Sequence, residues 1–158
     1  MQSIDLKKEL QKAFEGEPWH GPALVSVLKE VNPAIVNQKQ GQSHSIAELA
    51  SHLTAWAEEC AERIGGKAPS LPARGDWPED ISLDEAGWEK LVSELKVAQQ
   101  NLLDKISTLA NSDWQTWIGS GDEIDPEAGY TIQEMILGTI QHYAYHGGQI
   151  ILLARLFN

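Results

Sequence analysis

The chain is poor in cysteine, in basic residues and in long apolar runs. Cys60 is the only cysteine among 158 residues, so no internal disulfide can form and we expect a reducing compartment. Only 12 lysines and arginines stand against 23 aspartates and glutamates, which gives a net charge of -11. This sign disfavours binding to a phosphate backbone or to an anionic membrane surface. We therefore expect neither nucleic acid nor a membrane as a partner.

Targeting segments and sheet patterns are also lacking. The first residues contain no apolar core typical of a signal peptide, and no apolar run approaches the roughly 18 residues that cross a bilayer. We expect a cytoplasmic protein. No segment alternates apolar and polar residues long enough to predict a sheet. No repeat or shift in composition divides the chain, so residues 1–158 are expected to form a single domain with its own core.

Helical periodicity is the dominant pattern that is present. Three segments begin with Ser or Thr followed three residues later by Glu, the pattern of a capping box: Ser45…Glu48, Ser82…Glu85 and Thr131…Glu134. Apolar residues at helical spacing follow each of them and predict helices over 46–64, 83–109 and 132–157. The last of these is apolar nearly all round its axis, so we expect it to be the most buried element.

Two shorter amphipathic pieces, 4–14 and 22–31, precede these helices and form either one broken helix or two successive ones. Together the segments predict an all-α fold, a four-helix bundle with long connectors.

The most informative motif is the pair His142 and His146. Residues four apart lie on one face of a helix, roughly 6 Å apart, and Gln149 shares this face. Buried imidazoles need hydrogen-bond acceptors, water or a metal. His52, at the edge of the apolar face of helix 46–64, is the candidate third ligand. Three neutral histidines would bind zinc or a similar divalent ion and leave a coordination position open.

A simpler interpretation remains for each of these residues. A His-x-x-x-His pair is frequent by chance, and single histidines on apolar faces are often just hydrogen-bonded core residues. His44 and His20 are expected to be solvated loop residues, and Cys60 a small buried hydrophobe rather than a reactive thiol. Glu48 serves either as the helix cap or to orient a nearby histidine. The tripeptide Asp76-Trp-Pro78 predicts a turn, which is a candidate lid or pocket edge.

Four segments carry a family resemblance: residues 16–22, residues 44–52 leading to Trp56, residues 76–78, and the block His142-Tyr-Ala-Tyr-His-Gly-Gly-Gln-Ile150. In this order they resemble the DinB/YfiT-like superfamily. The resemblance implies an up-down-down-up four-helix bundle with an extra short N-terminal helix, and a homodimer. It also implies a divalent metal ion held by His52, His142 and His146.

The expected function is that of a metal-dependent enzyme acting on a small-molecule substrate. We expect the ion to be Zn, Ni, Fe or Mn, because three imidazoles suit several divalent ions. The resemblance implies either a thiol transferase or isomerase that uses a low-molecular-weight thiol, or a hydrolase. No carboxylate lies between His142 and His146, which weakens the protease-like option. The alternative is a non-catalytic metal- or ligand-binding protein, acting in a stress response or as a scaffold.

Overall fold

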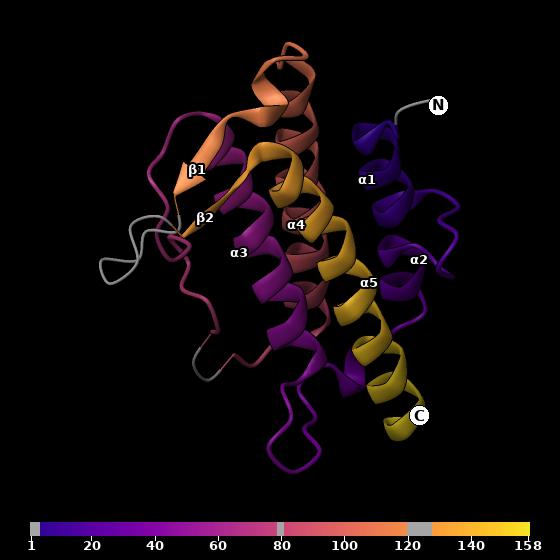
Figure 1. Ribbon diagram of the computed structural model, residues 1–158. Coiled ribbons are helices and arrows are strands. Elements are labelled where there is room, and N and C mark those ends of the chain that lie inside the picture. Colours follow the sequence, from indigo (N-terminus) through magenta and orange to yellow (C-terminus); the bar gives the residue numbers. More distant parts are fainter. Residues whose placement is uncertain (1–3, 79–80, 120–127) are drawn as a thin grey trace.

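The computed structural model describes residues 4–78, 81–119 and 128–158, and this part of the chain is mostly helical (Figure 1). Its five α-helices are α1 (Leu6–Glu15), α2 (Leu24–Lys29), α3 (Ile46–Ile64), α4 (Glu85–Ser107) and α5 (Ile132–Phe157). Two short 3-10 helices, η1 (Pro33–Ile35) and η2 (Asp113–Gln115), lie in the connectors. The expected all-α class is confirmed, and the two N-terminal pieces are successive helices. Among the described residues, no helix combines the length and the apolar character needed to cross a membrane.

Two of the three predicted capping boxes are present. The Ser45 hydroxyl accepts a hydrogen bond from the backbone N–H of Glu48, whose carboxylate accepts one from the N–H of Ser45. Thr131 and Glu134 are bonded in the same reciprocal way. These bonds satisfy N–H groups that a first helical turn leaves free. α3 and α5 accordingly begin where predicted, and both also end where the periodicity predicts.

The predicted cap at Ser82 is wrong. Asp84 is the N-cap of α4, and its carboxylate accepts a hydrogen bond from the backbone N–H of Gly87 at 2.8 Å. The side chain of Asn37 bonds both backbone groups of Leu83, donating to its carbonyl at 2.8 Å and accepting from its N–H at 2.9 Å. The Leu83 carbonyl accepts from the side chain of Asn37 and not from a backbone N–H of the helix. α4 therefore begins at Glu85, later than the predicted start at residue 83.

The connector between α4 and α5 contains a two-stranded sheet that was not predicted. Strand β1 (Trp117–Gly119) pairs antiparallel with β2 (Gly129–Thr131), and Ile118 lies opposite Tyr130. Strands this short give no recognisable alternation in the sequence. A Cβ atom at Gly129 would lie 2.5 Å from the carbonyl oxygen of Ile118, so the close approach of the strands requires glycine there.

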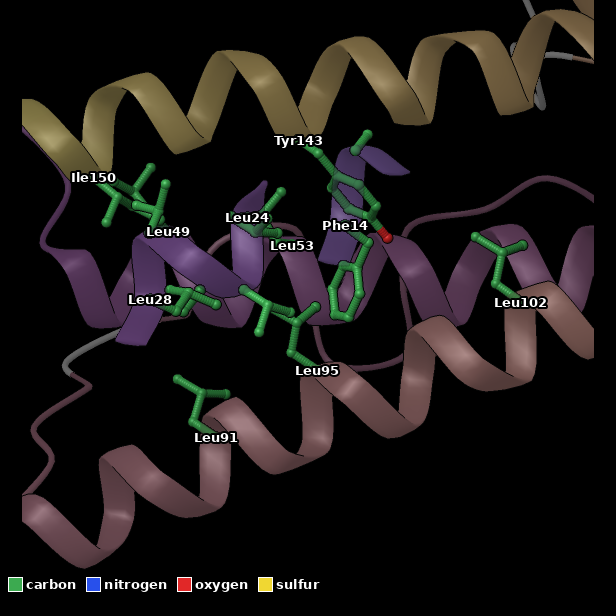
Figure 2. Packing of buried hydrophobic residues seen from close by; sticks show 14 of the residues in the cluster. Phe14, Leu24, Leu28, Leu49, Leu53, Leu91, Leu95, Leu102, Tyr143 and Ile150 are labelled. Carbon is green, nitrogen blue, oxygen red and sulfur yellow. The ribbon is translucent and has the colours of Figure 1, made fainter. Parts of the chain in front are cut away.

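The core lies between α3, α4 and α5, with α1 and α2 packed against α5 (Figure 2). Leu53, Leu95 and Ile150, one from each of the three long helices, are completely buried. The ring of Phe14 on α1 packs against that of Tyr143 on α5, with 5.7 Å between the centroids. Each fully buried side chain of this size stabilises the fold by roughly 1.5–3 kcal/mol.

The most buried helix is α3, and the expectation that α5 would be so is wrong. α3 buries polar and charged side chains as well as apolar ones: Glu48, His52, Thr54, Glu59 and Arg63. It packs against α4 and α5, and the connector after it also contacts it. α5 instead leaves large apolar side chains exposed along one side, so its continuous apolar character does not reflect burial in the monomer.

Candidate metal centre

Three histidines from α3 and α5 come together at the predicted site. Nε2 of His52 lies 3.0 Å from Nε2 of His142, and one ring nitrogen of each of His52, His142 and His146 lies within 4.8 Å of the others. The ring centroids are 4.5 to 4.9 Å apart. His52 and His146 are each only 5% exposed. The structure thus juxtaposes the three residues that the sequence singled out, although they come from helices far apart in the chain.

The outer nitrogens of two rings are held by hydrogen-bond acceptors. Nδ1 of His52 donates to the backbone carbonyl of Asp76 at 2.7 Å, and Nδ1 of His146 donates to Oε1 of Gln149 at 2.6 Å. With the proton held on Nδ1, Nε2 of each ring presents a lone pair to the cluster. Histidines that bind metals are commonly oriented in this way by a partner on the far nitrogen.

The connector after α3 positions His52 through Asp76 and Trp77. The Asp76 carboxylate lies 3.2 Å from Nδ1 of His52 and accepts a hydrogen bond from Nε1 of Trp56 at 2.7 Å. The Trp77 ring stacks on His52 with 3.9 Å between centroids, and its other face stacks on His44 at 3.6 Å. This pair of residues was predicted only to form a turn at a pocket edge. The contact of these two residues with His52 could not be predicted from the sequence, because this contact depends on tertiary packing.

The electrostatic environment keeps the three rings neutral. Burial is the main cause that lowers the pKa of His52 and of His146. For His142, burial and the neighbouring histidines lower the pKa to about 4. At neutral pH all three imidazoles are therefore unprotonated, which is the form that binds a metal ion.

The donor set fits a divalent ion. Two metal–nitrogen bonds of about 2.1 Å span at most about 4.2 Å, which is close to the 4.8 Å within which the three nitrogens lie of one another. His52, His142 and His146 could thus hold a metal ion. Imidazole nitrogens suit Zn, Cu, Fe and Ni without selecting one of them. Three protein ligands leave a further coordination position for a small molecule.

Two nearby candidates do not join the cluster. Glu48 accepts hydrogen bonds from Ser45 and, at 2.6 Å, from Lys39, so its carboxylate serves the helix cap rather than orienting His52. Hydrogen bonds to Lys39 and Ser45 outweigh the opposing effect of burial and lower the pKa of Glu48. His44 is 45% exposed at its side chain, as expected of a loop residue, but it also stacks on Trp77.

The remaining two candidates lie away from the cluster. His20 is exposed in the loop between α1 and α2, as predicted. Cys60 is buried on α3, with Sγ 3.6 Å from Oγ1 of Thr139, and burial raises the pKa of its thiol. This environment agrees with a small buried hydrophobe and disfavours a reactive thiolate.

These features define a helical protein in which three neutral histidines from two helices could hold one metal ion. The chain belongs to the DinB superfamily, whose family model matches residues 19–150. The match confirms the superfamily that the sequence motifs indicated. No curated protein and no solved structure matches the chain significantly.

Proposed function

We propose that this protein is a metal-dependent enzyme that acts on a small molecule at the cluster of His52, His142 and His146. The observation that carries the proposal is the convergence of three neutral imidazoles, two of them fixed at Nδ1. The ion would be Zn, Ni, Fe or Mn. When bound, such an ion polarises a substrate group and lowers the pKa of water or of a thiol. The chain's own residues would hold the ion and restrict access of water to it.

Thiol transfer or isomerisation is the reaction that the surrounding residues favour over hydrolysis. Hydrolysis benefits from a carboxylate that accepts a proton beside the metal. The Asp76 carboxylate lies on the outer side of the His52 ring and is bonded to Trp56, while Glu48 is occupied by the helix cap. Neither is placed to serve as that base. A low-molecular-weight thiol is therefore the proposed co-substrate, with hydrolysis as the second reaction.

A non-catalytic metal- or ligand-binding protein is the alternative. It is favoured by the near-complete burial of His52 and His146 and by the stacking of Trp77 on His52, which restrict access to the cluster. In this case the ion would hold α3 and α5 together without reacting.

Metal analysis of the purified protein is the first test. We expect about one ion per chain in the wild type, and loss of the ion in His142→Ala. His44→Ala is the matched control, because it removes a ring on the far side of Trp77 and should leave the ion in place. The proposal is wrong if protein prepared without chelators takes up no Zn, Ni, Fe or Mn.

Activity and access to the ion are tested next. We expect Co²⁺-loaded protein to change its visible spectrum when a low-molecular-weight thiol is added, and to conjugate that thiol to electrophilic acceptors. His142→Ala should lose both properties, while ester and amide substrates test hydrolysis. A bound ion whose spectrum does not respond to thiol, azide or cyanide would support the non-catalytic alternative instead.

The up-down-down-up connectivity is part of the same proposal. The connector of residues 65–84 returns along α3, since it brings Asp76 beside His52 before α4 begins. Parallel neighbouring helices need a long connection of this kind, whereas short loops join antiparallel ones. The course of the chain in Figure 1 supports parallel α3 and α4. We also propose a cytoplasmic location, with which the free, buried thiol of Cys60 agrees.

A further inference from the structure

The connector after α3 is fixed mainly by side chains and hardly by its own backbone. Residues 68–78 form no helix or strand, and among the described residues their one backbone–backbone hydrogen bond joins the N–H of Gly75 to the carbonyl of Pro72 at 2.8 Å. This bond lies within the connector. A segment of this kind takes many conformations unless other contacts hold it, because unfixed residues retain backbone entropy. The position of Asp76, which orients His52, therefore depends on what anchors the connector.

Arg63, near the end of α3, is the inner anchor. Its side chain is only 7% exposed and uses all three guanidinium nitrogens. Nε donates to the carboxylate of Glu59 at 2.8 Å, Nη2 donates to the backbone carbonyl of Ser70 at 2.7 Å, and Nη1 donates to the hydroxyl of Tyr130. The buried carboxylate of Glu59 also accepts from Nζ of Lys67 at 2.6 Å. Two positions of the connector, residues 67 and 70, are thus bound to the end of α3.

Arg74 is the outer anchor, two residues before Asp76. Its Nε and Nη2 donate to the two carboxylate oxygens of Glu58 on α3 at 2.8 and 2.9 Å, and Nη1 donates to Glu94 on α4 at 2.7 Å. A single exposed ion pair contributes little, but a two-pronged pair extended by a second carboxylate is the geometry that does contribute. Gly75 follows with φ of 84°, a conformation that favours glycine, so the chain turns between the anchored arginine and Asp76.

Trp56 links the inner anchor to the metal centre. Cζ of Arg63 lies 5.4 Å from the centroid of the Trp56 ring, a favourable contact between a cation and an aromatic face. The indole N–H of Trp56 donates to the carboxylate of Asp76 at 2.7 Å. The backbone carbonyl of Asp76 accepts from Nδ1 of His52 at 2.7 Å. One continuous set of contacts therefore runs from Arg63 to a ligand of the proposed ion.

We propose that Arg63 and Arg74 are positioning residues of the metal centre, which hold the connector so that Asp76 fixes Nδ1 of His52. Neither arginine is a ligand, and both act through Asp76. The inference rests on the proposed function in that the cluster holds an ion. If the two anchors served stability alone, their loss would lower the free energy of unfolding and leave the His52 ring as it is. The experiments below separate these two roles.

Zn²⁺ titration of Arg74→Met in competition with a chromophoric chelator is the first test. We expect the affinity to fall about threefold to fivefold, the scale of a few exposed ion pairs. Lys90→Met is the matched control and should bind as the wild type does, because Nζ of Lys90 lies 3.8 Å from the same Glu94 but this ion pair lies within α4. Arg74→Lys keeps the charge without the two-pronged geometry and should fall between the two. Equal affinities of Arg74→Met and the wild type would overturn the role of Arg74.

Arg63 is tested in a double variant, because Arg63→Met alone would leave the buried Glu59 carboxylate without its main partner. Arg63→Met combined with Glu59→Leu removes both charges, an exchange that buried ion pairs often tolerate. We expect this variant to keep its helical content and to bind Zn²⁺ about tenfold more weakly, as when a partner of a metal-bound histidine is lost. A folded double variant with wild-type affinity would contradict the role of Arg63.

The ring nitrogens of His52 give a measurement that needs no metal. In the metal-free wild type at neutral pH, their ¹⁵N chemical shifts should place the proton on Nδ1, where the Asp76 carbonyl accepts it. Arg74→Met should move these shifts toward a mixture of both tautomers, while Lys90→Met should leave them unchanged. Shifts of His52 that are the same in Arg74→Met and in the wild type would overturn the proposal. A wild type that binds no metal but shows the expected change would refute the proposed function and still support the positioning role.

Discussion

The backbone carbonyl of Asp76 accepts a hydrogen bond from Nδ1 of His52 at 2.7 Å, and the carboxylate of Asp76 lies 3.2 Å from the same nitrogen. The carboxylate is itself fixed by the indole N–H of Trp56. The orientation of His52 therefore depends on a connector that follows its helix, as well as on α3. Changes in this connector should alter metal binding without removing any ligand.

Asp76→Ala should weaken metal affinity by about tenfold, which is the lower end of the effect of such outer partners. The variant keeps the backbone carbonyl but removes the carboxylate and leaves the N–H of Trp56 without its acceptor. Asp76→Asn is the matched control: it retains an oxygen for Trp56 and should bind within a few-fold of the wild type. Zn²⁺ titration in competition with a chromophoric chelator measures both. Equal affinities of all three proteins would show that the side chain has no orienting role.

Gln149 offers a similar test on the other helix. Gln149→Leu removes the acceptor on Nδ1 of His146 and should weaken Zn²⁺ binding by about 10-fold to 100-fold. Gln149→Glu keeps an acceptor oxygen and adds negative charge, so its affinity should equal or exceed that of the wild type. Calorimetric titration distinguishes these outcomes. Weaker binding by Gln149→Glu than by Gln149→Leu would contradict this role.

The metal-free protein should lose stability as the pH falls from about 6.5 to 4.5. The pKa of His142 is lowered to about 4, from an ordinary value of 6.5, so in this window the unfolded chain binds more protons than the folded one. Protonation of the unfolded state then favours unfolding, by up to about 3 kcal/mol for this residue near pH 4. Urea unfolding at several pH values, with chelator present, measures the trend.

His142→Gln is the control for this pH dependence. Its neutral side chain does not titrate, so its stability should change less between pH 6.5 and 4.5 than that of the wild type. Burial and hydrogen bonding also shift the carboxyl of Glu48, but its lowered pKa has an effect mainly below the ordinary value of 4.5. A wild-type stability that is constant between pH 6.5 and 4.5 would contradict the proposed environment of the cluster.

The start of α4 provides a test of the corrected cap. Asp84→Ala removes the acceptor for the N–H of Gly87 and should lower the free energy of unfolding by about 1 kcal/mol. Ser82→Ala should change it by less than about 0.5 kcal/mol, because Ser82 does not cap the helix. Chemical denaturation of the two variants compares them directly. A larger loss for Ser82→Ala would restore the original prediction.

The sequence could predict those features that local interactions determine. The capping boxes at Ser45 and Thr131, followed by apolar residues of helical period, were sufficient to predict both ends of α3 and α5. The start of α4 was missed because Asn37, 46 residues away, bonds the backbone of Leu83. The periodicity of α5 could not show which apolar residues the chain itself covers, so the exposed side was mistaken for a buried one.

The same distinction applies to the candidate site. The spacing of His142 and His146 on one helix, together with the apolar face bearing His52, indicated the cluster. Asp76 and Trp77 carried no such signal, because neither periodicity nor spacing relates a connector to the middle of a helix. The family resemblance singled out these residues as a motif without showing their contact with His52.

Nε2 of His52 and Nε2 of His142 are 3.0 Å apart in space and 90 residues apart in sequence. An ion shared by the two rings would act as a reversible cross-link that closes a loop of more than half the chain. Closing a loop of this length costs an unfolded chain about 4–5 kcal/mol in entropy, so the ligands must separate before the chain gains its full freedom. Resistance to proteolysis and the rate of unfolding would then depend on the supply of metal.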